Sequence, residues 1–80
     1  MHTIYLGLGT NLGDRTANLQ AAIAGLAEKL VITAVSPIYQ TPPWGVTDQP
    51  DFLNLCLAAQ TDLTPDDLLT FVKNLEAALG

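Results

Sequence analysis

Basic residues are scarce in this 80-residue sequence: three Lys and Arg stand against eight Asp and Glu, giving a formal net charge of −5. Charged residues of both signs make up only 14% of the chain. We expect no nucleic-acid partner, because neutralising backbone phosphates requires clustered Lys and Arg. On composition alone, the same shortage argues against ATP or another polyphosphate as a ligand of these residues.

Cysteine and long apolar runs are scarce too. The single cysteine, Cys56, cannot form an internal disulfide, which favours a reducing environment. No apolar run approaches the roughly 20 residues that span a bilayer. Residues 1–3 also lack the basic start of a signal peptide. We therefore expect a cytoplasmic protein with no membrane partner.

Apolar residues, in contrast, make up 49% of the chain, which excludes a disordered tail. The length is enough for one small domain over residues 1–80. A domain of this size buries only roughly 60% of its unfolded surface, so its margin of stability is thin.

Hydrophobic periodicity predicts five elements in the order β-α-β-β-α. Pro37 interrupts the second strand and indicates an edge position or a bulge. Asp14 and Thr64 are suited to cap the two helices, and Pro65 suits a first helical position. The predicted elements are a strand over 3–8, a helix over 15–30, strands over 31–41 and 52–60, and a helix opening at 65.

The order indicates an α+β fold with two helices on one face of an antiparallel-containing sheet. It matches the first five elements of the ferredoxin-like arrangement β-α-β-β-α-β and lacks the sixth. Strand 3–8 is apolar on both faces, which is typical of a central, doubly covered strand. Without a sixth strand it becomes a bare sheet edge, which natural proteins avoid. Either the chain has been cut short or a partner supplies the strand.

The glycine-rich segment after the first strand allows two interpretations. Gly7, Gly9 and Gly13 could form a phosphate cradle at a helix start, as in dinucleotide-binding proteins. The spacing is G-x-G-x-x-x-G, however, and no acidic residue follows where a ribose-binding one is expected. We favour a turn that needs positive φ, capped by Asn11 and Asp14, with room for another glycine-dependent role.

Phe52 and Asn54 lie two residues apart on one strand, so their side chains share a face. Together they could hold a planar heterocycle, with the ring stacked on Phe52 and its polar edge bonded by the Asn54 amide. A solvated Asn beside a sheet-edge Phe is the alternative. The proline-rich loop before this strand could present Trp44 at a defined position, or Trp44 could cap the core under the loop.

No residue is a candidate for catalysis or metal binding. Asp66 and Asp67 are adjacent and diverge on a helix, where capping explains them better. Cys56 has no His or basic residue next to it in the sequence to favour its thiolate, so we expect no nucleophile. The sequence contains no D-x-D pair.

Taken together, three motifs resemble the amino-terminal half of the 6-hydroxymethyl-7,8-dihydropterin pyrophosphokinase family. The stretch from Leu69 to Gly80 resembles that family's second helix, so the resemblance covers essentially the whole chain. The motifs are G-x-G-T-N-L-G-D over residues 7–14, S-x-I-Y-x-T-P-P over 36–43 and Q-P-D-F-L-N over 49–54.

The resemblance implies a ferredoxin-like enzyme of folate biosynthesis. Such an enzyme transfers pyrophosphate from ATP to the hydroxymethyl group of the pterin, with Mg²⁺ ions. It implies a pterin site at Thr41, Pro42, Trp44, Phe52 and Asn54. Many family members have Tyr at the position of Phe52, so this chain keeps the stacking face and lacks a hydroxyl.

The resemblance also implies a loop and pocket floor at Gly7, Gly9 and Asn11, and a nucleotide side that begins at Lys73 and Glu76. The family's metal-binding aspartates and ATP-clamping arginines belong to its other half. We therefore expect these 80 residues to hold neither ATP nor Mg²⁺ alone and to be inactive alone. The alternative is a non-catalytic ferredoxin-like module that senses a ligand or dimerises by strand pairing or swapping through the exposed first strand.

Overall fold

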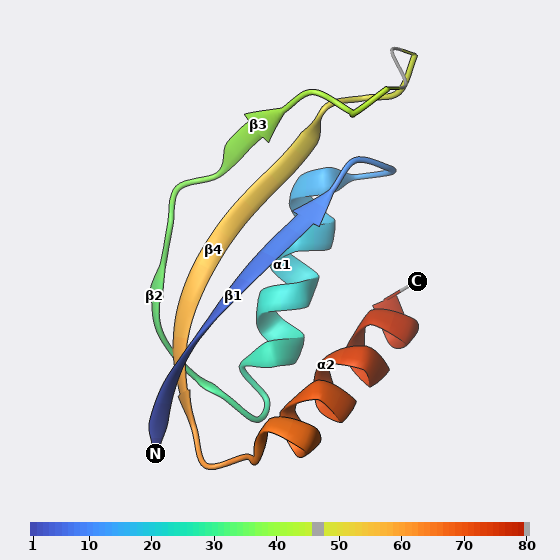
Figure 1. Ribbon diagram of the computed structural model, residues 1–80. Helices are drawn as coiled ribbons and strands as arrows, with labels where there is room; N and C mark the ends of the chain where they lie inside the picture. Colours follow the sequence, from blue (N-terminus) through green and yellow to red (C-terminus); the bar gives the residue numbers. More distant parts are fainter. Residues whose placement is uncertain (46–47, 80) are drawn as a thin grey trace.

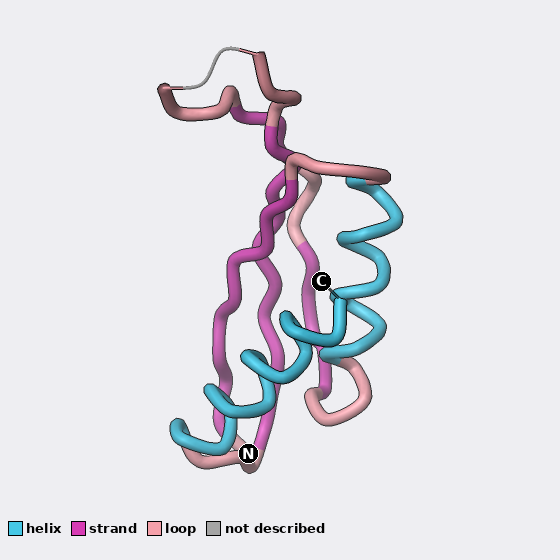
Figure 2. The backbone as a smooth tube through the Cα atoms, turned by 90° about the vertical axis from the view of Figure 1, so that its right-hand side faces the viewer, coloured by secondary structure: helices cyan, strands magenta, loops and turns pink. Residues whose placement is uncertain are grey.

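The structure, a computed structural model, describes residues 1–45 and 48–79. Four strands form one sheet, and both helices pack on the same face of it (Figures 1 and 2), so the predicted α+β fold is confirmed. In the part of the chain described, no helix has the length and apolar character needed to cross a membrane. The elements are β1 (His2–Thr10), α1 (Arg15–Leu26), β2 (Val31–Val35), β3 (Tyr39–Thr41), β4 (Phe52–Thr61) and α2 (Pro65–Leu79).

β4 is the centre of the sheet. The strand order is β1-β4-β2, with β3 also paired to β4, and every pairing is antiparallel. β1 pairs with β4 from His2 opposite Thr61 to Thr10 opposite Leu53, and within the described residues its other side has no neighbouring strand. The bare edge expected without a sixth strand is thus present. The prediction that this strand is covered on both faces is wrong, because Tyr5 is 79% exposed on the face away from the helices.

The predicted strand over 31–41 is two strands, β2 and β3, separated around Pro37. Ser36 maintains the pairing with β4 up to this point. Its backbone N–H donates to the Cys56 carbonyl at 2.8 Å, and its Oγ accepts from the Cys56 N–H at 2.9 Å. Pro37 has no N–H with which to continue the ladder. A register shift between Ile32 and Ala34 adds a second irregularity.

The first helix begins as predicted and ends earlier than predicted. Asp14 Oδ1 accepts a hydrogen bond from the Ala17 N–H at 3.1 Å, which is an N-cap. α1 ends at Leu26, and residues 27–30 form a turn in which the Leu30 N–H donates to the Leu26 carbonyl at 3.0 Å. Leu30, in this turn, is nevertheless buried. The apolar pattern therefore correctly predicted the burial of Leu30 but not the end of the helix.

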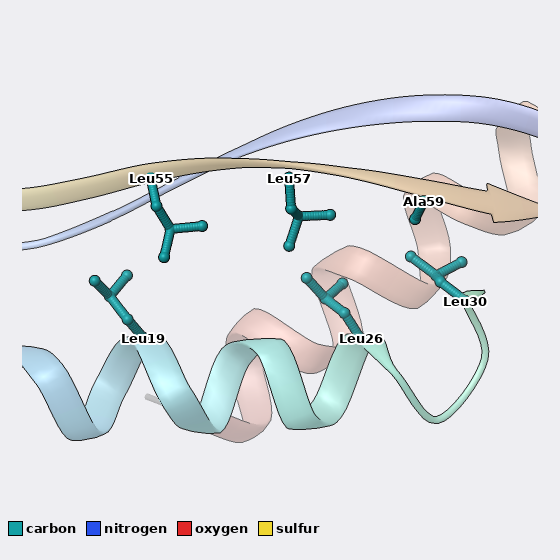
Figure 3. Close-up of a cluster of buried hydrophobic side chains, with 6 residues drawn as sticks. All are labelled: Leu19, Leu26, Leu30, Leu55, Leu57 and Ala59. Carbon is teal, nitrogen blue, oxygen red and sulfur yellow. The ribbon is translucent and has the colours of Figure 1, made fainter. Parts of the chain in front are cut away.

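The core lies between α1 and β4 (Figure 3). The predicted aliphatic face of β4 is confirmed, because its apolar side chains point towards the helices. Each buried Leu contributes roughly 1.5–3 kcal/mol through removal of apolar surface from water. The buried residues of this cluster are Leu19, Leu26, Leu30, Leu55, Leu57 and Ala59.

α2 covers the rest of the same face. Thr64 caps it, since its Oγ1 accepts from the Asp67 N–H at 3.2 Å. Its predicted apolar stripe packs against the core through half-buried side chains. Leu79, at the end of that stripe, remains 48% exposed.

Candidate functional site

Asn54 lies where three strands meet at one end of the sheet. It pairs with Gly9 of β1 on one side and with Tyr39 of β3 on the other. Its Nδ2 donates a hydrogen bond to Thr41 Oγ1 at 2.7 Å. The structure therefore brings together two of the residues predicted to bind a pterin, Thr41 and Asn54, which are separated by 13 positions in the sequence.

Phe52 lies beside this pair. It is opposite Thr41 in the pairing of β3 with β4, and both Phe52 and Asn54 are half-buried. Because Leu53 and Leu55 point to the helices, Phe52 and Asn54 point to the opposite, open face. An aromatic ring and a carboxamide thus share one face and one end of the sheet, as the alternation predicts.

The loop after β3 forms a shallow cavity of about 290 Å³. Trp44 is 98% exposed, so the interpretation in which it caps the core is wrong. Gly45 has φ of +71°, a left-handed conformation that glycine adopts without strain. The cavity is lined by Thr41, Pro42, Pro43, Trp44 and Gly45.

Side-chain hydrogen bonds tie this loop to both neighbouring segments. Arg15 Nη1 donates to the Asp51 carbonyl at 2.7 Å, and Gln40 Nε2 donates to Asp51 Oδ2 at 2.9 Å. Asn11 Nδ2 donates to Gln49 Oε1 at 3.2 Å, which joins the glycine segment to the loop. Sequence reasoning missed these anchors, because such hydrogen bonds over 11 to 38 positions leave no local pattern.

The glycine segment fits the turn interpretation in part: Asp14 caps α1 as predicted, whereas Asn11 bonds to Gln49 in place of capping the helix. β1 continues through Gly9 to Thr10, and Gly13 has φ of +68° in the turn that follows. The Asp14 carboxylate occupies the start of α1, where a phosphate would have to bind. Asn18 Nδ2 donates to the Leu12 carbonyl at 2.9 Å and holds the turn against α1.

The two residues predicted for the nucleotide side lie apart from Asn54. Lys73 and Glu76 are on α2, which packs on the helix face, whereas Asn54 points to the open face. Glu76 lines a second cavity of about 480 Å³ between β1, α1 and α2. Gly7 and Gly9 also line it with their backbone, and Lys73 does not.

Across residues 1–45 and 48–79, no group of three His, Cys, Asp or Glu side chains is arranged to hold a metal ion. Two of the three basic residues have other contacts. Arg15 is bonded to Asp51, and Lys29 Nζ lies 5.3 Å from the centre of the Phe71 ring.

Comparisons with known proteins give a consistent result. Residues 5–80 match the model of the 7,8-dihydro-6-hydroxymethylpterin-pyrophosphokinase (HPPK) family. The chain is 49% identical over 82 residues to a 2-amino-4-hydroxy-6-hydroxymethyldihydropteridine pyrophosphokinase of Methylorubrum extorquens, covering all of this chain and 52% of the relative. It is 44% identical over 80 residues to the enzyme of the same name from Aquifex aeolicus, covering 100% of this chain and 50% of the relative.

A third relative of that name, from Bacillus subtilis, is 41% identical over 78 residues, covering 95% of this chain and 47% of the relative. The chain thus spans about half the length of the curated relatives it matches. With the family model matched over nearly the whole chain, the resemblance seen in the three motifs is confirmed. This chain belongs to the 7,8-dihydro-6-hydroxymethylpterin-pyrophosphokinase family.

Proposed function

We propose that this chain supplies the pterin-recognising half of an enzyme that transfers pyrophosphate from ATP to 6-hydroxymethyl-7,8-dihydropterin in folate biosynthesis. The observation that carries the proposal is the Asn54 carboxamide, held by Thr41 at 2.7 Å beside Phe52 and the proline-rich loop. Family membership and the names of three pyrophosphokinase relatives support the same reaction.

The Asn54 side chain has capacity left for a ligand. A carboxamide has two N–H donors and an acceptor oxygen, and Thr41 Oγ1 accepts from Nδ2. The second N–H and Oδ1 then match the donor and acceptor groups along the edge of a pterin ring. Phe52 supplies an apolar surface on which the flat ring can stack. Asn54 therefore reads the ring edge while Phe52 holds its plane.

The loop supplies the wall of the proposed site. Pro42 and Pro43 fix φ and lack N–H groups, so the backbone they form is stiff. Trp44, exposed at its end, is available to contact a bound ring. A pre-organised wall lowers the entropic cost of binding. Gly7, Gly9 and Asn11 form the neighbouring floor and loop in this proposal.

ATP and Mg²⁺ are assigned to the part of the enzyme that residues 1–80 do not cover. The described residues contain no group of three side chains arranged to hold a metal, and the chain has only three Lys and Arg to bind phosphates. Mg²⁺ would neutralise charge developing on the transferred phosphates. In this proposal the nucleotide side begins at Lys73 and Glu76 on α2.

The test is a titration of the ¹⁵N-labelled chain with 6-hydroxymethylpterin, followed by NMR. We expect saturable shifts at the Thr41 amide, the Trp44 indole N–H and the Asn54 side-chain amide. ATP with Mg²⁺, titrated separately, should produce no saturable shift. Pterin shifts that avoid these three residues, or saturable binding of ATP, would contradict the proposal.

A second candidate function rests on the free edge of β1. Among the residues that the structure describes, no strand pairs with this edge of the nine-residue β1, so its backbone groups are a template for another strand. In this alternative the chain is a non-catalytic module that dimerises through β1. Sedimentation analysis combined with the pterin titration distinguishes the two: a chain that forms a dimer and does not bind the pterin supports the module.

A further inference from the structure

We propose that Gly9 is a positioning residue, whose missing side chain leaves the space in which the Asn54 carboxamide lies. Its effect on pterin binding rests on the proposed function, but its effect on Asn54 does not. Gly9 of β1 and Asn54 of β4 are direct partners in the sheet register. Directly opposed residues on one face have Cβ atoms roughly 4.5–5.5 Å apart.

A Cβ at Gly9 would clash with the Asn54 amide. It would lie 2.7 Å from Asn54 Oδ1 and 3.7 Å from Asn54 Cγ. The first distance is well inside the roughly 3.5 Å at which non-bonded atoms attract best. The next nearest atom, the Leu53 carbonyl oxygen, is at 3.9 Å, an ordinary contact. Alanine at position 9 would therefore displace the amide of Asn54 and little else.

Backbone conformation does not explain the glycine at position 9. Among the described residues, the glycines with positive φ are Gly13 and Gly45, whereas Gly9 lies in a strand where alanine is tolerated without backbone strain. Gly7, which lies on the same face of β1, provides the comparison. A Cβ at Gly7 would meet no atom within 4 Å. The two outward glycines of β1 thus differ in their relation to Asn54.

Displacing the amide would break the hydrogen bond that orients it. Asn54 Nδ2 reaches Thr41 Oγ1 at 2.7 Å in the present rotamer. A change of its side-chain torsions moves Oδ1 away from β1 and moves Nδ2 with it. The free N–H and Oδ1 would then no longer face the ring edge, and a polar group of the ligand would be left unpaired.

The first experiment measures the position of the amide in the chain itself. Gly9→Ala and Gly7→Ala variants are compared with the parent by NMR, using the Asn54 side-chain NH₂ signals and their NOE contacts to Thr41. We expect Gly9→Ala to shift these signals and remove the contacts, and Gly7→Ala to preserve both. Unchanged Asn54 signals and contacts in Gly9→Ala would overturn the proposal.

The second experiment tests whether Gly9 acts through Asn54. The affinity for 6-hydroxymethylpterin is measured in Gly9→Ala, in Asn54→Ala and in the double variant. We expect each single change to weaken binding about tenfold, and the double variant to bind no more weakly than Asn54→Ala. If Gly9→Ala weakened pterin binding as much in the Asn54→Ala background as it does in the parent chain, the proposal would be overturned.

Two further outcomes are informative. If Asn54→Ala leaves the affinity unchanged, the proposed function fails, while the NMR comparison still decides the role of Gly9. If Gly9→Ala prevents folding, adding Asn54→Ala must restore it, because that change removes both of the nearest atoms. A double variant that remains unfolded would overturn the proposal.

Discussion

Asn54 shows how one side chain can depend on residues far from it in the sequence. Its hydrogen-bond partner Thr41 belongs to β3, and its packing partner Gly9 belongs to β1. Each of the three strands contributes one part of the arrangement. An asparagine side chain has two torsions and would otherwise sample several orientations, so these two neighbours hold the carboxamide in the orientation that the proposed pterin site requires.

Gly25 marks a second close approach, between the two helices. A Cβ there would lie within 3.3 Å of Leu75 Cγ and 3.1 Å of its Cδ2, so the whole side chain would have to move. Gly→Ala inside a helix normally stabilises by up to about 1 kcal/mol. We expect Gly25→Ala to destabilise instead by about 1 kcal/mol, because overpacking outweighs propensity. Urea unfolding measures this.

The control for this prediction removes the obstacle. In a Leu75→Ala background, Gly25→Ala has room and should stabilise the chain, as helix propensity predicts. A stabilising effect in the parent chain, equal to that in the Leu75→Ala background, would show that the helices are not in close contact at this point.

Thr61 supports the turn into α2 from a buried position. It is 2% exposed, and its Oγ1 accepts from the Leu63 N–H at 3.0 Å. Thr61→Val keeps the shape and leaves that N–H unpaired, which should lower the unfolding free energy by about 1–3 kcal/mol. Thr33→Val is the matched control. Its hydroxyl donates to the Ala58 carbonyl at 3.2 Å on the exposed face, where water can replace it. Equal losses in the two variants would contradict this account.

Sequence reasoning at this scale succeeded where the physical cause is local. Asp14 and Thr64 could be assigned as caps because each side-chain oxygen meets an N–H three residues later. The alternation of β4 likewise assigns Phe52 and Asn54 to one face. Gly9, Gly25 and Thr61 could not be explained in this way, because their roles depend on neighbours supplied by the tertiary fold.

At the scale of elements, the sheet has one protected strand and one open strand. β4 is paired on both sides, whereas β1 has β4 on one side and, in the described residues, no strand on the other. Hydrophobicity misled the prediction for β1, since an apolar run does not show whether both faces of a strand are covered or only one. Pro37 indicated a break in the predicted strand. The sequence did not show that Ser36 keeps the pairing with β4 up to that break, because its hydrogen bonds to Cys56 depend on the tertiary fold.

Amide hydrogen exchange tests this difference between strands. We expect the slowest exchange in β4, around Leu57, and fast exchange at alternate residues of β1, whose N–H groups point to the free edge. If every amide of β1 were as protected as those of β4, its edge would be paired with another strand. Loss of that protection on dilution would then favour the dimerising alternative.

For the whole molecule, the net charge of −5 takes on a different meaning. It first argues against any polyphosphate ligand. In a chain that spans about half of its pyrophosphokinase relatives, it is compatible with the proposal that these residues bind the pterin and not ATP. Composition alone could not separate these interpretations, because it does not show which half of a site a chain contributes.

The account predicts that the 80-residue chain is inactive alone. Incubation with ATP, Mg²⁺ and 6-hydroxymethyl-7,8-dihydropterin should release no AMP above the level without protein. The reason is that the described residues contain no group of three side chains arranged to hold a metal ion. Chromatographic quantification of AMP measures this. Turnover by the purified chain would show that these residues contain a metal and nucleotide site after all.

The proposed pterin site is best tested by steady-state assay of a chimera in which this chain is joined to the remaining half of the Methylorubrum extorquens relative. We predict AMP formation, with Asn54→Ala raising the KM for the pterin about tenfold or more and changing the KM for ATP by less than about twofold. Asn74→Ala, an exposed Asn→Ala control on α2, should change neither. A folded chimera that forms no AMP, or one in which Asn54→Ala leaves the pterin KM unchanged, would contradict the account.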